Sequence, residues 1–176
     1  HNGHVTLAEY FSKLPELDEV LVVISPQSPF KKEDGLINDT ERLEMAEIVF
    51  KKFDNVRVSD IEFKMSKPNF TIDTLKEFKK RHKYNKLILL IGEDNLVGFN
   101  KWKDYKKIIE IAEVYVYPRD TNQKIPDEIL TNNNIKLVDA PKIKISSSHI
   151  RELIKSNKKI DGLVPKEVLG FFKFIT

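Results

Sequence analysis

The sequence has 176 residues but no cysteine, only one tryptophan and no long apolar run. Without cysteine there is no disulfide framework and no thiolate ligand for a metal, which agrees with a reducing compartment. No stretch approaches the roughly 20 apolar residues of a membrane-spanning helix, and nothing resembles a signal peptide. We therefore expect a cytoplasmic protein without a membrane partner.

The sequence also lacks a strong charge of either sign. Its 30 basic and 27 acidic residues give a formal net charge of +3, which is too small to predict a nucleic-acid surface. A length of 176 residues with 40% hydrophobic side chains is enough for one complete core. We expect residues 1–176 to form a single domain, and a homo-oligomer is compatible with the sequence.

The chain opens with two histidines around a glycine, His1-Asn2-Gly3-His4. Apolar residues then recur at helical spacing, which predicts a helix that starts at His4. A helix start carries unpaired backbone N–H groups and a positive dipole end, so it can hold a phosphate. Gly3 would let that phosphate approach the backbone, and both imidazoles could donate hydrogen bonds to charge that develops in a reaction.

Other interpretations of these four residues stay open. A solvated helix end or a remnant of a histidine tag would look the same. A zinc site fits less well, because only His82 and His149 could supply further imidazole ligands.

Predicted strands and helices alternate along the rest of the chain. The predicted strands cover 19–24, 56–61, 86–91, 114–117 and 135–138, with the first buried on both faces. Helices are predicted from 38 to about 52, from 71, at 103–111, from 148 and from 165. Asn38 and Glu41 resemble a capping box at the start of the first of these. This order predicts an α/β protein with a Rossmann-like three-layer α/β/α architecture and a mostly parallel sheet. We expect one further strand and a turn to precede residue 1.

A second candidate phosphate site lies near the other end, in Ile145-Ser146-Ser147-Ser148-His149-Ile150-Arg151. Three hydroxyls stand at a predicted helix start, with an arginine one turn inside, and together they could clamp an anion. An ordinary serine cap followed by a surface arginine is the alternative. We expect this cluster and the histidine pair to meet around one triphosphate.

Four ordered motifs resemble those of bacterial nicotinate mononucleotide adenylyltransferases. They are the H-x-G-H of residues 1–4, the F-T-I-D-T-L of residues 70–75, the I-G-E-D of residues 91–94 with Trp102 beyond it, and the I-S-S-S-x-I-R of residues 145–151. The resemblance runs from His1 to about Phe172. Ser148 replaces the family's threonine and keeps its hydroxyl. The family's glycine-rich segment before H-x-G-H is not in the sequence, so its ATP contacts cannot be assigned.

The resemblance implies transfer of the adenylyl group of ATP to nicotinate mononucleotide. It implies Mg²⁺ held mainly by ATP phosphates and water, with no metal site on the protein. The residues it implies are His1, His4 and Arg151 for catalysis; Gly3, Gly92, Asp94, Ser146, Ser147, Ser148 and Arg151 for ATP; and Phe70, Thr71, Trp102, Lys31 and Arg119 for the mononucleotide.

The acceptor chemistry fits these residues. The attacking phosphate monoester is mostly dianionic near neutral pH, so no general base is needed. A helix capped by Thr71 would present N–H groups and a hydroxyl to the ring carboxylate, whereas a ring amide would leave its donors unmatched. Trp102 would stack on the pyridine ring; the alternative is an ordinary core aromatic. Asp94 would accept from the ribose hydroxyls, or else simply cap a helix.

Rival functions share parts of this pattern. Lys64-Met65-Ser66-Lys67 together with H-x-G-H is similar to the paired signatures of class I aminoacyl-tRNA synthetases. There, however, the lysine loop follows the last strand of the catalytic domain, so we interpret Lys64 and Lys67 as exposed loop charges. A phosphopantetheine adenylyltransferase is the nearest rival. A nucleotide-binding regulator without turnover and a nucleic-acid-binding module are further alternatives.

Overall fold

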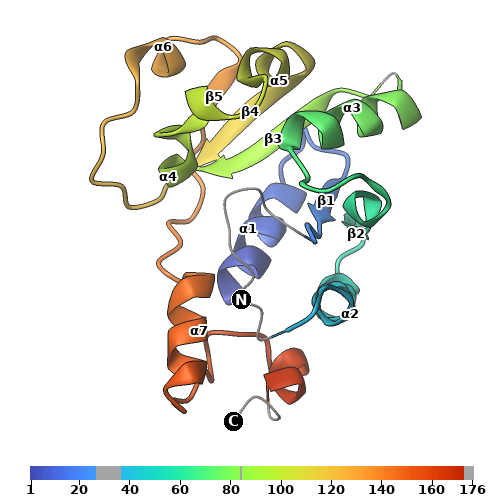
Figure 1. Cartoon of the computed structure of the whole chain (residues 1–176), viewed down its shortest axis with the longest axis vertical. Helices are drawn as coiled ribbons and strands as arrows, with labels where there is room; N and C mark the ends of the chain where they lie inside the picture. The colour runs from blue at the N-terminus through green and yellow to red at the C-terminus, as the bar shows by residue number, and fades with distance from the viewer. Residues whose placement is uncertain (27–36, 84, 173–176) are drawn as a thin grey trace. The chain divides into compact units, whose positions relative to one another are not determined.

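The computed structural model describes residues 1–26, 37–83 and 85–172 (Figure 1). Contacts between residues divide the chain into two compact units. Unit 1 consists of residues 1–68 and 144–176, and unit 2 consists of residues 69–143. The single domain expected from the sequence stays a prediction, and each unit is described by itself.

Unit 1 contains a parallel pair of strands with helices from both ends of the chain. Its elements are α1 (Asn2–Ser12), β1 (Val20–Val23), α2 (Asp39–Phe50), β2 (Val56–Ser59), the 3-10 helix η1 (Ile61–Lys64), α7 (Ser147–Lys155) and the 3-10 helix η3 (Lys166–Phe172). β1 and β2 pair in parallel, with Val20 opposite Val56 and Val22 opposite Val58. The helix predicted from Pro165 is therefore a 3-10 helix.

Helix α1 buries the apolar stripe that the sequence predicts. Leu7, Ala8 and Phe11 are all buried, and Phe11 is only 1% exposed. The helix begins two residues earlier than expected, so His4 occupies its third position and Gly3 lies buried in its first turn. In β1, Leu21 is 39% exposed, so the prediction of a strand buried on both faces is wrong at this position.

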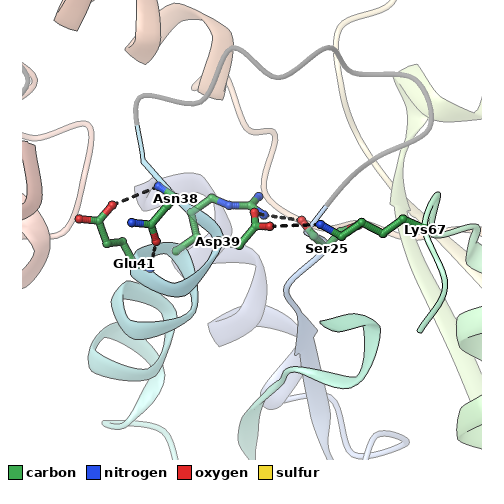
Figure 2. Close-up of polar contacts among 6 residues, drawn as sticks. Ser25, Asn38, Asp39, Glu41 and Lys67 are labelled. Atoms are coloured by element: carbon green, nitrogen blue, oxygen red, sulfur yellow. Dashed lines mark hydrogen bonds and ion pairs between the residues drawn. The ribbon is translucent and has the colours of Figure 1, made fainter. Parts of the chain in front are cut away.

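Helix α2 begins with the capping box that the sequence predicts. The Asn38 side-chain oxygen accepts from the Glu41 backbone nitrogen at 2.9 Å, and a Glu41 carboxylate oxygen accepts from the Asn38 nitrogen at 3.1 Å (Figure 2). The two residues thus satisfy each other's backbone donors at an end where a helix has no internal partners.

Unit 2 contains a three-stranded parallel sheet in the order β3-β4-β5. Its elements are α3 (Thr71–Arg81), β3 (Leu87–Gly92), α4 (Glu93–Leu96), the 3-10 helix η2 (Phe99–Lys101), α5 (Tyr105–Ile111), β4 (Ala112–Tyr117), α6 (Asp127–Leu130) and β5 (Ile135–Leu137). Figure 1 shows the three strands side by side. The parallel α/β architecture expected from the sequence is confirmed, although the short helix α6 was not foreseen.

The core of unit 2 lies on one face of this sheet. Val114 and Val116 are almost completely buried there, and they belong to one apolar cluster with Ile72 of α3 and Ile108 of α5. At the carboxyl ends of the strands, Gly92 of β3 stands opposite Tyr117 of β4. Side chains just beyond this edge are well placed for a ligand, because crevices of open parallel sheets form there.

No helix within the described ranges is both long and apolar enough to cross a bilayer.

Candidate active site

The two histidines at the start of α1 form a stacked pair. Their ring centroids are 3.8 Å apart and the ring planes differ by 14°. Nδ1 of His4 lies 3.5 Å from the backbone nitrogen of His1. When Nδ1 accepts this hydrogen bond, the neutral ring carries its proton on Nε2. The His4 side chain is exposed at the start of the helix.

The start of α1 is fastened to the segment that follows α7. The Asn2 backbone nitrogen donates to the Leu163 carbonyl at 2.9 Å, and the Asn2 side-chain amide donates to the Gly162 carbonyl at 2.8 Å. Gly162 has a φ of +77°, a left-handed conformation that favours glycine. The histidine pair is thus tied to the C-terminal part of the chain. That it meets the serine-arginine cluster around one triphosphate stays a prediction.

Helix α7 begins within the predicted serine cluster. Ser146 is its N-cap, and the Ser146 hydroxyl accepts from the His149 backbone nitrogen at 3.2 Å. Arg151 donates to the Ser148 hydroxyl at 3.1 Å, which holds the guanidinium beside the first turn. Ser146 therefore acts as the ordinary serine cap that the sequence analysis gave as the alternative. The same arrangement keeps the Arg151 guanidinium at the end of α7 where the helix dipole is positive. The prediction of an anion site stays untested.

Three residues predicted separately come together at the carboxyl edge of the unit 2 sheet. Gly92 is the N-cap residue of α4, and a Cβ atom there would lie 2.4 Å from Oδ1 of Asp94 and 2.8 Å from Cγ of Arg119. Nε of Arg119 lies 3.6 Å from Oδ2 of Asp94. The absence of a side chain at Gly92 thus lets Asp94 and Arg119 pack closely against it. Asp94 does not cap α4, because it lies inside the helix.

Tyr117 completes this cluster and was not foreseen. Its ring carbon Cε2 lies 3.1 Å from the position of a Cβ on Gly92. Burial raises the pKa of the Tyr117 hydroxyl, although the positive charge of Arg119 acts in the opposite direction. The hydroxyl is therefore neutral at physiological pH. The sequence indicated only that Tyr117 ends a predicted strand, at the edge of the sheet where ligands bind.

The aromatic residues predicted to bind the mononucleotide lie against the unit 2 core. Phe70 is the N-cap residue of α3, and both Phe70 and Trp102 are partly buried against the same apolar cluster. The Trp102 ring is 5.2 Å from that of Phe99, so Trp102 is in part the core aromatic that the alternative proposed. The predicted cap by Thr71 is wrong: Thr71 is the first helical residue, and α3 has no side-chain cap.

A polar network at the end of β1 was also not foreseen. Arg42 of α2 donates to the Ser25 carbonyl and, at 2.7 Å, to Oδ1 of Asp39. Nζ of Lys67 lies 3.9 Å from the other oxygen of Asp39 (Figure 2). Arg42 thus fixes the chain just after β1 to the start of α2. Lys64 and Lys67 are exposed, as expected, although Lys64 belongs to η1 rather than to a loop.

Lys31, a candidate for the mononucleotide phosphate, lies outside the described residues. Within the described residues, no group of three histidine, cysteine, aspartate or glutamate side chains could hold a metal ion.

Comparison with known proteins agrees with the motifs and the fold. Residues 1–153 match the cytidylyltransferase-like family. Similar bacterial proteins carry the name "Probable nicotinate-nucleotide adenylyltransferase", among them the following three. The chain is 36% identical to that of Flavobacterium psychrophilum over 96% of this chain and 87% of the relative. It is 39% identical to that of Christiangramia forsetii over the same shares, and 39% identical to that of Cytophaga hutchinsonii over 96% and 86%.

A solved structure supports the same fold. The nicotinic acid mononucleotide adenylyltransferase of Plasmodium falciparum, solved in complex with APC, superimposes with a TM-score of 0.75 at 20% identity. The match covers 97% of this chain and 87% of that structure. This likeness shows the nucleotidyltransferase fold, and the bacterial relatives supply the closer assignment. The chain belongs to the cytidylyltransferase-like family and, within it, to the nicotinate-nucleotide adenylyltransferases.

Proposed function

We propose that this protein transfers the adenylyl group of ATP to nicotinate mononucleotide, which gives nicotinate adenine dinucleotide and pyrophosphate. The observation that carries the proposal is the identity of 36–39% to nicotinate-nucleotide adenylyltransferases over 96% of the chain. The four ordered motifs support it, since each lies within residues 1–153, which match the cytidylyltransferase-like family.

The reaction needs charge neutralisation more than proton transfer. A phosphate oxygen of the mononucleotide forms a bond to the α-phosphorus of ATP, while the bond from that phosphorus to the α,β-bridging oxygen breaks. Pyrophosphate leaves with the electron pair. The attacking phosphate is already largely ionised, because its second pKa is about 6. Catalysis can therefore rest on alignment and on donors aimed at the phosphates.

We assign the triphosphate to residues of unit 1. The His4 imidazole is the best candidate to donate to the α-phosphate, where charge builds up during transfer. His1 stacks on His4 and holds its ring in place. Gly3 allows a close approach to the helix start. The hydroxyls of Ser146, Ser147 and Ser148 and the guanidinium of Arg151 would hold the leaving phosphates.

We assign the adenosine ribose and the pyridine ring to residues of unit 2. Asp94 would accept from the ribose hydroxyls beside Gly92. Arg119, which pairs with Asp94, both orients that carboxylate and is a candidate for the mononucleotide phosphate. The first N–H groups of α3, at Phe70 and Thr71, would bind the ring carboxylate, and Trp102 would stack on the ring.

Magnesium would enter with the nucleotide. An ion would be bound mainly by phosphate oxygens and water, because Mg²⁺ keeps much of its hydration. Bound there, it would neutralise phosphate charge. We further propose that the enzyme acts in the cytoplasm without a nucleic-acid partner, and self-association is compatible with this function.

A pyrophosphate-release assay across several acceptors tests the function. Purified protein with ATP and Mg²⁺ should release pyrophosphate with nicotinate mononucleotide, and far less with nicotinamide mononucleotide or phosphopantetheine. Preference for phosphopantetheine would instead favour the sister enzyme. Binding of ATP without turnover on any acceptor would favour a regulator.

A further inference from the structure

Lys103 links the segment that carries Trp102 to the first turn of α3. Its ammonium lies 2.8 Å from Oδ2 of Asp73 and 4.5 Å from the centre of the Phe70 ring. Phe70 is the N-cap residue of α3, and Asp73 is the acidic residue of its first turn. One lysine thus contacts both ends of the first turn, directly after the tryptophan proposed to stack on the substrate.

Asp73 has two opposite electrostatic effects at this position. A carboxylate in the first turn interacts favourably with the helix dipole, which helps α3 to form. The same negative charge would repel an anionic ligand at the same helix start. The Lys103 ammonium at 2.8 Å compensates that charge, so the positive end of the dipole remains available to a carboxylate.

The pair has little importance for folding. The side chains of Lys103 and Asp73 are 45% and 37% exposed, and ion pairs this exposed contribute little to stability because water screens them. The contact with Phe70 adds a cation–π interaction, which is also weak because the Lys103 side chain stays in contact with water. A functional effect of Lys103 can therefore be separated from loss of the fold.

We propose that Lys103 is a specificity residue, which compensates the charge of Asp73 so that the start of α3 accepts the ring carboxylate of nicotinate mononucleotide rather than a neutral amide. This inference rests on the proposed function and deepens it. It assigns the preference for the acid over the amide to the Lys103–Asp73 pair together with the backbone donors of α3.

The test is a double-mutant cycle with an acid and an amide ligand. Lys103→Met keeps most of the length of the side chain and removes its charge, Asp73→Asn removes the opposing charge, and Lys103→Arg retains the cation. Lys107→Met is the matched control, because it breaks another exposed pair, Lys107–Asp104 at 3.4 Å. For each protein, KM and kcat with nicotinate mononucleotide are measured at saturating ATP, together with the Ki of nicotinamide mononucleotide as a competitor.

Lys103→Met should raise the KM for nicotinate mononucleotide about fivefold, the order expected for the loss of one charge interaction over about 4 Å where water screens it. Its kcat, the Ki of the amide and the melting temperature should stay close to those of the wild type. Asp73→Asn in the Lys103→Met background should restore the KM, and Lys103→Arg should retain it. Lys107→Met should change none of these values.

Two results would contradict the inference. An equal loss of affinity for acid and amide in Lys103→Met, or no recovery in the double variant, would show that the pair has no role in specificity. In either case the wild type would still turn over nicotinate mononucleotide, so the proposed function would stand. If the wild type itself showed no turnover with this acceptor, the proposed function would fail and the inference with it.

Discussion

Replacing Gly92 by alanine should disturb the cluster at the carboxyl edge of the unit 2 sheet without straining the backbone. Gly92 has φ −80° and ψ 153°, an extended conformation that alanine adopts freely. The cost therefore comes only from contacts of the new methyl group. That group would lie 2.4 Å from Oδ1 of Asp94, 2.8 Å from Cγ of Arg119 and 3.1 Å from Cε2 of Tyr117.

These distances set the expected magnitude. Carbon atoms pack best at about 3.5–4.0 Å, so the Arg119 stem and the Tyr117 ring must both move. Overpacking of this kind costs about 1–3 kcal/mol. Because the Asp94 carboxylate can swing away, we expect about 1–2 kcal/mol, which corresponds to a fall in Tm of about 3–6 °C for a chain of this size. The displaced carboxylate should also raise the KM for ATP by about tenfold, the loss expected for one good hydrogen bond to a charged group.

The chain offers a matched control in Gly98→Ala. Gly98 also has a negative φ, −109°, and a Cβ there would meet nothing within 4 Å. This variant should keep the KM for ATP and keep or slightly raise the Tm, because alanine reduces the freedom of the unfolded chain. Thermal unfolding by circular dichroism and pyrophosphate release at varied ATP measure both effects. If Gly92→Ala matched Gly98→Ala in Tm and in KM, the reasoning about this cluster would be refuted.

The remaining predictions concern the histidine pair, the tryptophan and one ion-pair network. His4→Ala should lower kcat by about 10²–10³, the loss seen when one donor to a developing charge is removed, while the Tm changes little because His4 is exposed; a kcat within threefold of the wild type would exclude the proposed role. Trp102→Ala should raise the KM for nicotinate mononucleotide and leave the KM for ATP unchanged, and an unchanged acceptor KM would argue against stacking. Hydrogen bonds from Lys136 and Lys86 lower the pKa of Glu113, so the ionised carboxylate stabilises the fold above the ordinary glutamate pKa and loses this effect as the pH falls through the lowered value. The difference in unfolding free energy between the wild type and Glu113→Gln, measured by urea titration, should therefore be largest near neutral pH and shrink in acid; a difference that grows in acid would contradict the sign.

Local patterns predicted most elements well, because the signals act within a few residues. The Asn38–Glu41 capping box is an exchange of hydrogen bonds inside one helical turn, and it is found as expected. The type and the boundaries of some helices differ from the prediction. The helix expected from Pro165 is a 3-10 helix, and Thr71 is the first helical residue rather than the cap. Such differences arise because packing against the rest of a unit decides where a helix starts and how tightly it winds.

The sequence predicted most residues of the candidate site but few of the contacts among them. The motifs identified Gly92, Asp94 and Arg119 separately, and the structure shows that they touch. The contacts of Lys103 with Asp73 and Phe70 join positions about 30 residues apart. Nothing in the sequence pairs one lysine with one aspartate over that separation, since many combinations of exposed charges are equally compatible with it.

The sequence by itself determined the parallel α/β character and the family, because strand and helix periodicity and ordered motifs are local properties of the chain. Only the tertiary structure decided which side chains neutralise one another at the ends of the strands and at the start of α3. That choice depends on strand register, on the packing of α3 and α5 against the sheet, and on the absence of a side chain at Gly92. These are long-range properties, because each joins residues that the sequence leaves far apart.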